Sequence, residues 1–302
     1  KDRLAENPLA AQIGKDHNKG NMTLEEYLLQ IKDMKSHPTI QKHYFTVPIY
    51  LYDLFQSISR HYIRSSMTCV PSNYYSLLLA LTRGCYHTVV WLNLNYDLFA
   101  DYAIVALTGR GLRELSDYMN IEIPEKVRIM YTKPHGSVDW FRRNTRGISW
   151  EEIRRARIPS DFETTLSVEI ITQDSANRAG LGTASAQLYP AILPPIGHYE
   201  FLYKEHFATI IPILKETNTV LCIGFSALDQ DVLGLIKRHI PRIEKMKIIN
   251  GDSMSGGAAF KSIKDHCGDL VLQKQVDVVF SGGFSTFAKS EMTKWLSDPQ
   301  MH

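Results

Sequence analysis

Residues Thr88–Asp97 read TVVWLNLNYD, and this stretch decides the fold. The part Thr88–Leu94 is short, largely apolar and carries β-branched residues, which is typical of a strand buried on both faces. Asn95-Tyr96-Asp97 follows it directly. The stretch therefore predicts a buried strand whose carboxyl end carries polar side chains.

Three later segments repeat this pattern. They are Val127–Tyr131, Thr219–Gly224 and Met246–Asn250, and helical patterns separate most of the four strands. Apolar strands that alternate with helices favour a parallel sheet covered on both faces. We expect an α/β fold with a Rossmann-like, three-layer α/β/α architecture. Val276–Phe280 is a further candidate strand, and Thr286–Leu296 a closing helix.

The remaining segments are expected to complete a single domain over residues 1–302. Residues 1–87 have a mainly helical pattern, with apolar residues at helical spacing between Tyr50 and Ile63. Thr23 followed by acidic residues is typical of a helix start. The charged stretch 142–189 interrupts the strand and helix rhythm, and we interpret it as an inserted, mostly helical or irregular subdomain or lid. Its arginine cluster fits a solvated face better than a contact with a partner subunit or nucleic acid.

Composition excludes several classes of protein. The 34 basic and 32 acidic residues nearly balance, so the net charge of +2 gives no general attraction to nucleic acid or membranes. The four cysteines form no CxxC pair, which argues against a zinc ribbon and fits a reducing, cytoplasmic compartment. The apolar runs are too short to span a bilayer. The start at Lys1 suggests a chain that begins inside a longer protein.

The residues that follow the strands have the chemistry of a ligand site. In open parallel sheets, ligands bind beyond the carboxyl ends of the strands. Histidine is the residue type best suited to general base catalysis near neutrality, which makes His135 the candidate base, and Asn95 offers a donor and an acceptor to orient an amide or a water. The remaining strand-end residues could approach a phosphate or a ribose: Gly136, Gly224, Ser226 and Asn250. Each motif alone also fits a plain turn or a helix cap.

The order of these motifs resembles a known family. Leu94-Asn95-Tyr96-Asp97, then Lys133 to Trp140 (KPHGSVDW), then Ile223-Gly224-Phe225-Ser226 with Asp229 and Asp231 are similar to the sirtuin-like domains of prokaryotic antiphage defence proteins. The resemblance covers about Tyr86 to Asp252. It implies cleavage of NAD that needs Asn95 and His135, with Asp97 holding the Asn95 loop. It also implies dinucleotide contacts from these residues: Gly136, Ser137, Gly224, Ser226 and Asn250.

This sequence departs from the family pattern at three points. Sirtuins open with a strand and a glycine-rich phosphate loop, and none precedes Asn95 here, so the phosphate contacts of that loop are unassigned. Asn93 stands where the family often has Thr. The four-cysteine zinc module of deacetylating sirtuins is missing, which lowers the expectation of a protein deacylase. NAD cleavage in this family requires no metal, and we expect none.

The resemblance therefore predicts an NAD hydrolase that releases nicotinamide and ADP-ribose, depleting NAD in antiphage defence by abortive infection. It further predicts a homo-oligomer, an activating partner protein or an effector-sensing domain, because unregulated NAD loss would kill the cell. The main competing hypothesis is a non-catalytic module that binds NAD or ADP-ribose and acts as a regulator or scaffold. A protein deacylase and a purely structural subunit also stay open at this point.

Overall fold

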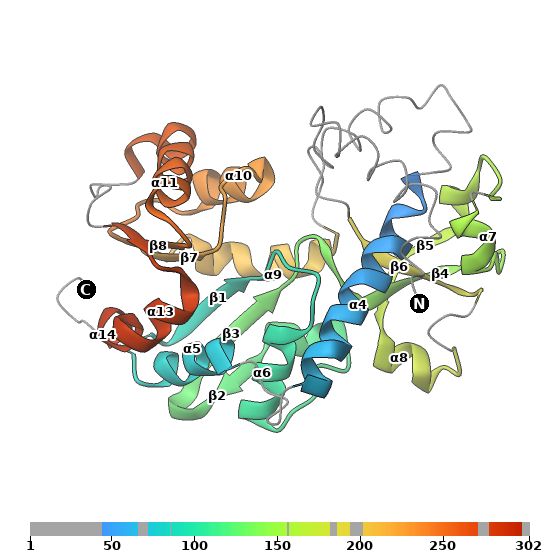
Figure 1. Ribbon diagram of the computed structural model, residues 1–302, viewed down its shortest axis with the longest axis horizontal. Helices are drawn as coiled ribbons and strands as arrows, with labels where there is room; N and C mark the ends of the chain where they lie inside the picture. Colours follow the sequence, from blue (N-terminus) through green and yellow to red (C-terminus); the bar gives the residue numbers. More distant parts are fainter. Residues whose placement is uncertain are drawn as a thin grey trace.

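The computed structural model describes residues 44–65, 72–84, 86–155, 157–181, 186–193, 202–270 and 278–297 (Figure 1). It is a mixed α/β structure with three sheets of three strands each. Two of the sheets contain the strands that the sequence predicts, and the third is antiparallel. The predicted helix start at Thr23 lies outside the described residues.

The first sheet has the strand order β1-β3-β2. β1 (Thr88–Leu92) pairs in parallel with β3 (Val127–Thr132), and β2 (Ile121–Ile123) adds to β3 in the antiparallel direction. α6 (Phe99–Thr108) lies between β1 and β2 in the chain and continues directly from the Asn95 loop. The predicted strands Thr88–Leu94 and Val127–Tyr131 are confirmed.

The parallel sheet has the order β7-β8-β9. It comprises β7 (Thr219–Ile223), β8 (Lys245–Asn250) and β9 (Val279–Ser281), and both pairings are parallel. α10 (Gln230–His239) and α11 (Ser253–Cys267) are the helices that follow β7 and β8. The prediction of parallel strands joined by helices is confirmed here.

Residues 142–189 contain strands of an antiparallel sheet that the sequence analysis did not predict, although short helices, turns and irregular segments make up most of the described part of this range. β4 (Gly136–Asn144), β5 (Leu166–Thr172) and β6 (Leu188–Ile192) form a sheet of order β5-β4-β6, and the short helices α7 (Trp150–Arg154) and α8 (Gln173–Arg178) lie between its strands in the chain. The segment forms strands because β5 and β6 are rich in residues with a high propensity for β-structure, although many charged residues lie around them in the sequence. Most apolar residues of these strands are buried, whereas Val168 and Glu169 of β5 are exposed.

The other helices cover the sheets. α4 (Val47–Ser65) packs on β4 and β6, and α9 (Lys204–Leu214) packs on β1 and α10. Figure 1 shows α5 beside the two C-terminal helices, and α5 contacts both of them. These three are α5 (Ser72–Thr82), α13 (Gly283–Ser290) and α14 (Met292–Ser297). Four 3-10 turns complete the described elements: η1 (Leu115–Met119), η2 (Pro124–Lys126), η3 (Phe162–Thr165) and η4 (Gly268–Leu270).

Two apolar clusters form the interior. The larger cluster surrounds two sheets, β1-β3-β2 and β7-β8-β9. The other cluster lies between α4 and the antiparallel sheet. β4 borders both, because Trp140 belongs to the larger cluster and its neighbour Phe141 to the other. Within the described ranges, no helix is long and apolar enough to cross a membrane.

Candidate functional site

The loops that follow β1 and β3 emerge side by side. The parallel register pairs Leu92 with Thr132, so both strands end at the same level. The main-chain N–H of Asn93 donates to the carbonyl of Thr132 at 2.9 Å, and that of Val138 donates to the carbonyl of Tyr96 at 3.0 Å. These bonds place the Asn-Tyr-Asp motif against the His-Gly-Ser motif.

Asn95 is exposed, and its loop is anchored by Asn93. The main-chain N–H of Asn95 donates to Oδ1 of Asn93 at 3.1 Å. The buried Asn93 amide in turn donates to the hydroxyl of Tyr131 at 2.7 Å. The side-chain amide of Asn95 has only a long contact, at 3.5 Å, with the hydroxyl of Tyr74. The carboxamide of Asn95 therefore faces solvent, while a hydrogen bond to Asn93 fixes its main chain. This arrangement suits a group that binds a ligand.

His135 contacts a carboxylate that follows a strand of another sheet. Its Nε2 lies 2.6 Å from Oδ2 of Asp229, and both side chains are largely buried. Oδ1 of Asp229 accepts the main-chain N–H groups of Asp231 and Val232, so the same residue is the N-cap of α10. Burial raises the pKa of Asp229, but the hydrogen bonds from His135 and Val232 outweigh it and leave the pKa below its ordinary value. The Asp229 carboxylate holds the imidazole in one orientation through this contact.

Gly136 is required by packing against β6. Its φ is +88°, and a Cβ at this position would lie 1.9 Å from the carbonyl oxygen of Ala191. The main-chain N–H of Leu193 also donates to the carbonyl of His135 at 2.8 Å. The space beside Gly136 is thus filled by protein, whereas the sequence led us to expect a ligand there.

Asp97 and Ser137 lie beneath the loop surface. Oδ1 of Asp97 accepts the main-chain N–H of Phe99 at 3.0 Å at the start of α6, and burial raises the pKa of this carboxyl. Ser137 is fully buried, and its hydroxyl accepts from Nζ of Lys133 at 2.9 Å. These positions suit residues that support the loops rather than residues at the surface.

The parallel sheet presents Gly224 and Ser226 at the surface. Gly224 has φ +63°, and no atom lies within 4 Å of the position of a Cβ, so the space beside it is open. Ser226 is exposed. Asn250 is buried at the end of β8, where its carbonyl accepts the main-chain N–H of Gly282 at 3.1 Å. Gly224 and Ser226 are therefore accessible to a ligand, and Asn250 lies deeper.

The sequence analysis did not assign a role to three polar residues close to the predicted ones. Lys133 and Asp101 form a buried ion pair at 3.1 Å. Asp139, on β4, has its pKa raised to about 7 by burial and by the charge of Asp101. Lys133 and Asp139 both flank the His-Gly-Ser motif, which was a usable signal. Asp101 lies within a helical pattern, and only the fold shows where it points.

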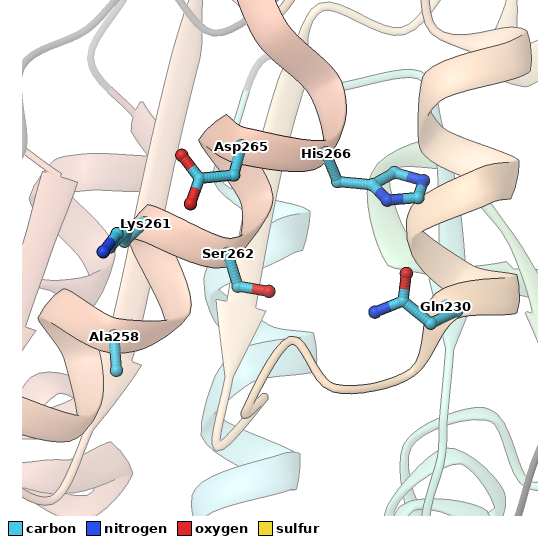
Figure 2. A pocket seen from close by; sticks show the side chains of 6 residues that line it. All are labelled: Gln230, Ala258, Lys261, Ser262, Asp265 and His266. Atoms are coloured by element: carbon cyan, nitrogen blue, oxygen red, sulfur yellow. The ribbon is translucent and has the colours of Figure 1, made fainter.

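A hollow of about 420 Å³ lies between α10 and α11. Figure 2 shows Gln230 and His266 turned toward each other across it, while Lys261 and Asp265 point away from α10. The hydroxyl of Ser262 donates to the carbonyl of Ala227 at 2.7 Å, so the hollow borders the loop that holds Gly224 and Asp229. In the part of the chain that the structure describes, no group of three or more His, Cys, Asp or Glu side chains is arranged to hold a metal ion.

A comparison of this chain with protein-family models, with curated proteins and with solved structures finds no match.

Proposed function

We propose that this protein hydrolyses NAD to nicotinamide and ADP-ribose at the site formed by Asn95, His135 and Asp229. The observation that carries the proposal is the 2.6 Å contact between His135 and Asp229. It joins the loop after β3 to the loop after β7, and the Asn95 loop lies against the same His-Gly-Ser segment. Three strand-end motifs that are far apart in the sequence are thus brought together around one imidazole.

The finer architecture is part of the proposal. The first and the parallel sheet share one apolar cluster, and α9 packs on β1 and on α10. We place both sheets in a Rossmann-like, three-layer domain whose ligand lies across the carboxyl ends of the strands. Residues 1–302 would form this single domain, with the antiparallel sheet as its insertion.

NAD would lie with its pyrophosphate near Gly224 and Ser226. Gly224 offers open main chain there, and Ser226 an exposed hydroxyl. The nicotinamide ribose would point toward Asn95 and His135. The exposed apolar side chains of Leu228 and Met254, after β7 and β8, provide surface for the adenine ring.

Cleavage breaks the bond between nicotinamide and C1′ of the ribose, and the departing nicotinamide takes the bonding electrons. Positive charge develops on the ribose, and water attacks C1′. Asn95 orients the nicotinamide or the water, and His135 accepts the proton that the water loses. Asp229 stabilises the resulting imidazolium. Rate acceleration comes mainly from orientation and from dipoles directed at the developing charge.

The cellular role follows from the family resemblance. We propose a cytoplasmic enzyme that depletes NAD in antiphage defence and is inactive until it is triggered. We also propose that it forms a homo-oligomer, that a partner protein or an effector-sensing domain activates it, or both. Each of these points rests on the resemblance of the motifs around Asn95, His135 and Gly224.

Release of nicotinamide from NAD tests the activity directly. We expect release by the wild type, alone or with its cellular partners, and a fall of about 10²-fold or more for Asn95→Ala and for His135→Ala under the same conditions, because each removes a group that acts on the reacting centre. The matched controls are Asn120→Ala and His87→Ala, which alter exposed side chains outside the site. Circular dichroism should show that all four variants are folded.

Two outcomes would overturn the proposal. If Asn95→Ala and His135→Ala release nicotinamide at the wild-type rate, the site is wrong. If the wild type binds NAD or ADP-ribose stoichiometrically in calorimetry and releases no nicotinamide, alone or with its cellular partners, the protein is a nucleotide-binding module instead.

A further inference from the structure

A buried ion pair lies directly beneath the two catalytic loops. Nζ of Lys133 is 3.1 Å from Oδ2 of Asp101, and their side chains are 0% and 8% exposed. Lys133 follows β3, and Asp101 lies in the first turn of α6. A lysine is rarely buried completely unless a charged partner and hydrogen-bond acceptors surround it, so this pair requires a reason.

Lys133 connects both loops to each other. Besides Asp101, its ammonium donates to the carbonyl of Asp97 at 2.5 Å and to the hydroxyl of Ser137 at 2.9 Å. An ammonium group has three N–H donors, and here each has an acceptor. One acceptor belongs to the Asn-Tyr-Asp motif and one to the His-Gly-Ser motif. The position of one loop is therefore fixed relative to the other through a single nitrogen.

Asp101 extends the same network to Asn95. Its carboxylate accepts from the hydroxyls of Tyr131 at 2.8 Å and Tyr118 at 3.2 Å. Tyr131 accepts in turn from the amide of Asn93, whose Oδ1 holds the main-chain N–H of Asn95. A continuous chain of buried polar contacts thus runs from Asn95 to Ser137, the second residue after His135.

We propose that Lys133 and Asp101 are positioning residues, whose pair holds the Asn95 loop and the His135 loop in the arrangement that NAD cleavage requires. This inference rests on the proposed function. Stability alone is a poor reason for the pair, because desolvation of two charges commonly cancels their attraction, and apolar substitutes are often as stable. Orientation of reacting groups is a better reason, because small displacements of a catalytic group lower the rate steeply.

The double variant Lys133→Met with Asp101→Asn separates the two roles. Each single variant leaves a charged partner buried and should unfold at a lower temperature, whereas the double variant removes both charges and should recover most of the loss. We expect the double variant to keep KM for NAD within about twofold and to lose at least about tenfold in kcat. Lys126→Met, at an exposed lysine just before β3, is the matched control and should leave kcat unchanged.

Hydrogen–deuterium exchange supplies a readout that does not depend on activity. In the double variant, exchange should rise in residues 93–98 and 134–138 and stay unchanged in β7 and β8. Tyr131→Phe removes only the hydroxyl that links Asn93 to Asp101, so exchange should rise in 93–98 alone. This second variant keeps the aromatic ring and the ion pair, and it tests the network if the double variant does not fold.

The outcomes distinguish this inference from the proposed function. Wild-type protein that releases no nicotinamide, alone or with its cellular partners, contradicts the function, while faster exchange in the two loops of the double variant still supports the positioning role. The positioning role is overturned, even if the enzyme is active, if both loops of the double variant exchange at the wild-type rate. It is likewise overturned if residues 93–98 of Tyr131→Phe exchange at the wild-type rate. A double variant that recovers both thermal stability and wild-type kcat also overturns it.

Discussion

At the scale of single residues, Asp229 uses its two oxygens for different purposes. Oδ1 caps α10 through the main-chain N–H groups of Asp231 and Val232, and Oδ2 contacts His135. The sequence could place Asp229 at a helix start, because an acidic residue before an amphipathic run is a typical N-cap. It could not pair Asp229 with His135, since 94 positions separate them and only the packing of the sheets brings them together.

Asp229→Asn should separate these two roles. An amide oxygen still accepts the α10 N–H groups, so the unfolding temperature should change little. The negative charge beside the imidazole is lost, so we expect kcat for NAD cleavage to fall by about 10- to 100-fold. Nicotinamide release and thermal unfolding measure the two effects. A large loss of stability with unchanged kcat would make Asp229 a cap only.

Gly136 and Gly224 form a second test at this scale, because both have positive φ but different surroundings. Gly136→Ala should cost about 3 kcal/mol or more of unfolding free energy, since its Cβ would overlap the Ala191 carbonyl. Gly224→Ala has open space and should cost about 1 kcal/mol, from φ alone. Urea denaturation gives both values, and equal losses would contradict the difference in packing.

At the scale of elements, the sequence predicted the parallel strands well and the antiparallel strands poorly. β1 and β7 are largely apolar runs followed by polar residues, and β3 and β8 keep this pattern despite one and two basic residues respectively. The antiparallel strands lie among charged residues, where an alternating pattern is easily taken for an irregular segment. β4 also begins at Gly136, within the His-Gly-Ser motif. Because we interpreted that motif as a loop, the start of the strand was not predicted.

Asp139 on β4 gives a pH-dependent prediction. Burial and Asp101 raise its pKa from 3.8 to about 7, while Lys133 lowers it. The folded state therefore holds a proton that the unfolded state releases above about pH 4, so this carboxyl destabilises the fold increasingly as pH rises from about 4 to 7.

Asp139→Asn should remove this effect. We expect a gain of about 1–3 kcal/mol in unfolding free energy at pH 8 relative to the wild type, and a much smaller difference at pH 4. Urea denaturation of both proteins at the two pH values measures it. The same gain at both pH values would show that the ionisation of Asp139 is not the cause.

At the scale of the whole molecule, the proposed site joins parts that belong to different sheets. Asn95 and His135 follow strands of the first sheet, whereas Gly224 and Asp229 follow β7 of the parallel sheet. The sequence predicted that the loops after these strands lie near one another, because parallel strands end at one edge. The division into three sheets was not predictable, because hydrogen bonding between strands depends on contacts that are distant in the sequence.

Because the proposed site joins loops from two sheets, bound NAD should raise the free energy of unfolding of the protein. With His135→Ala to prevent turnover, NAD at about 100 times its Kd should add about 2.7 kcal/mol to the unfolding free energy. A rise in the thermal unfolding midpoint measures this, and nicotinamide alone, which lacks the phosphates and the adenine, is the control. An unchanged midpoint at millimolar NAD would contradict binding at this site.

The packing of Gly136 against β6 has a mechanical consequence. The main-chain N–H of Leu193, just after β6, donates to the carbonyl of His135. The carbonyl of Ala191 occupies the space that a side chain at position 136 would take, so the two main chains are in direct contact. A translation of β6 is therefore transmitted through main-chain atoms to the imidazole, with no flexible side chain between them to absorb it. We therefore expect a deformation of the antiparallel sheet to move the main chain of His135 and to change the distance from the imidazole to Asn95.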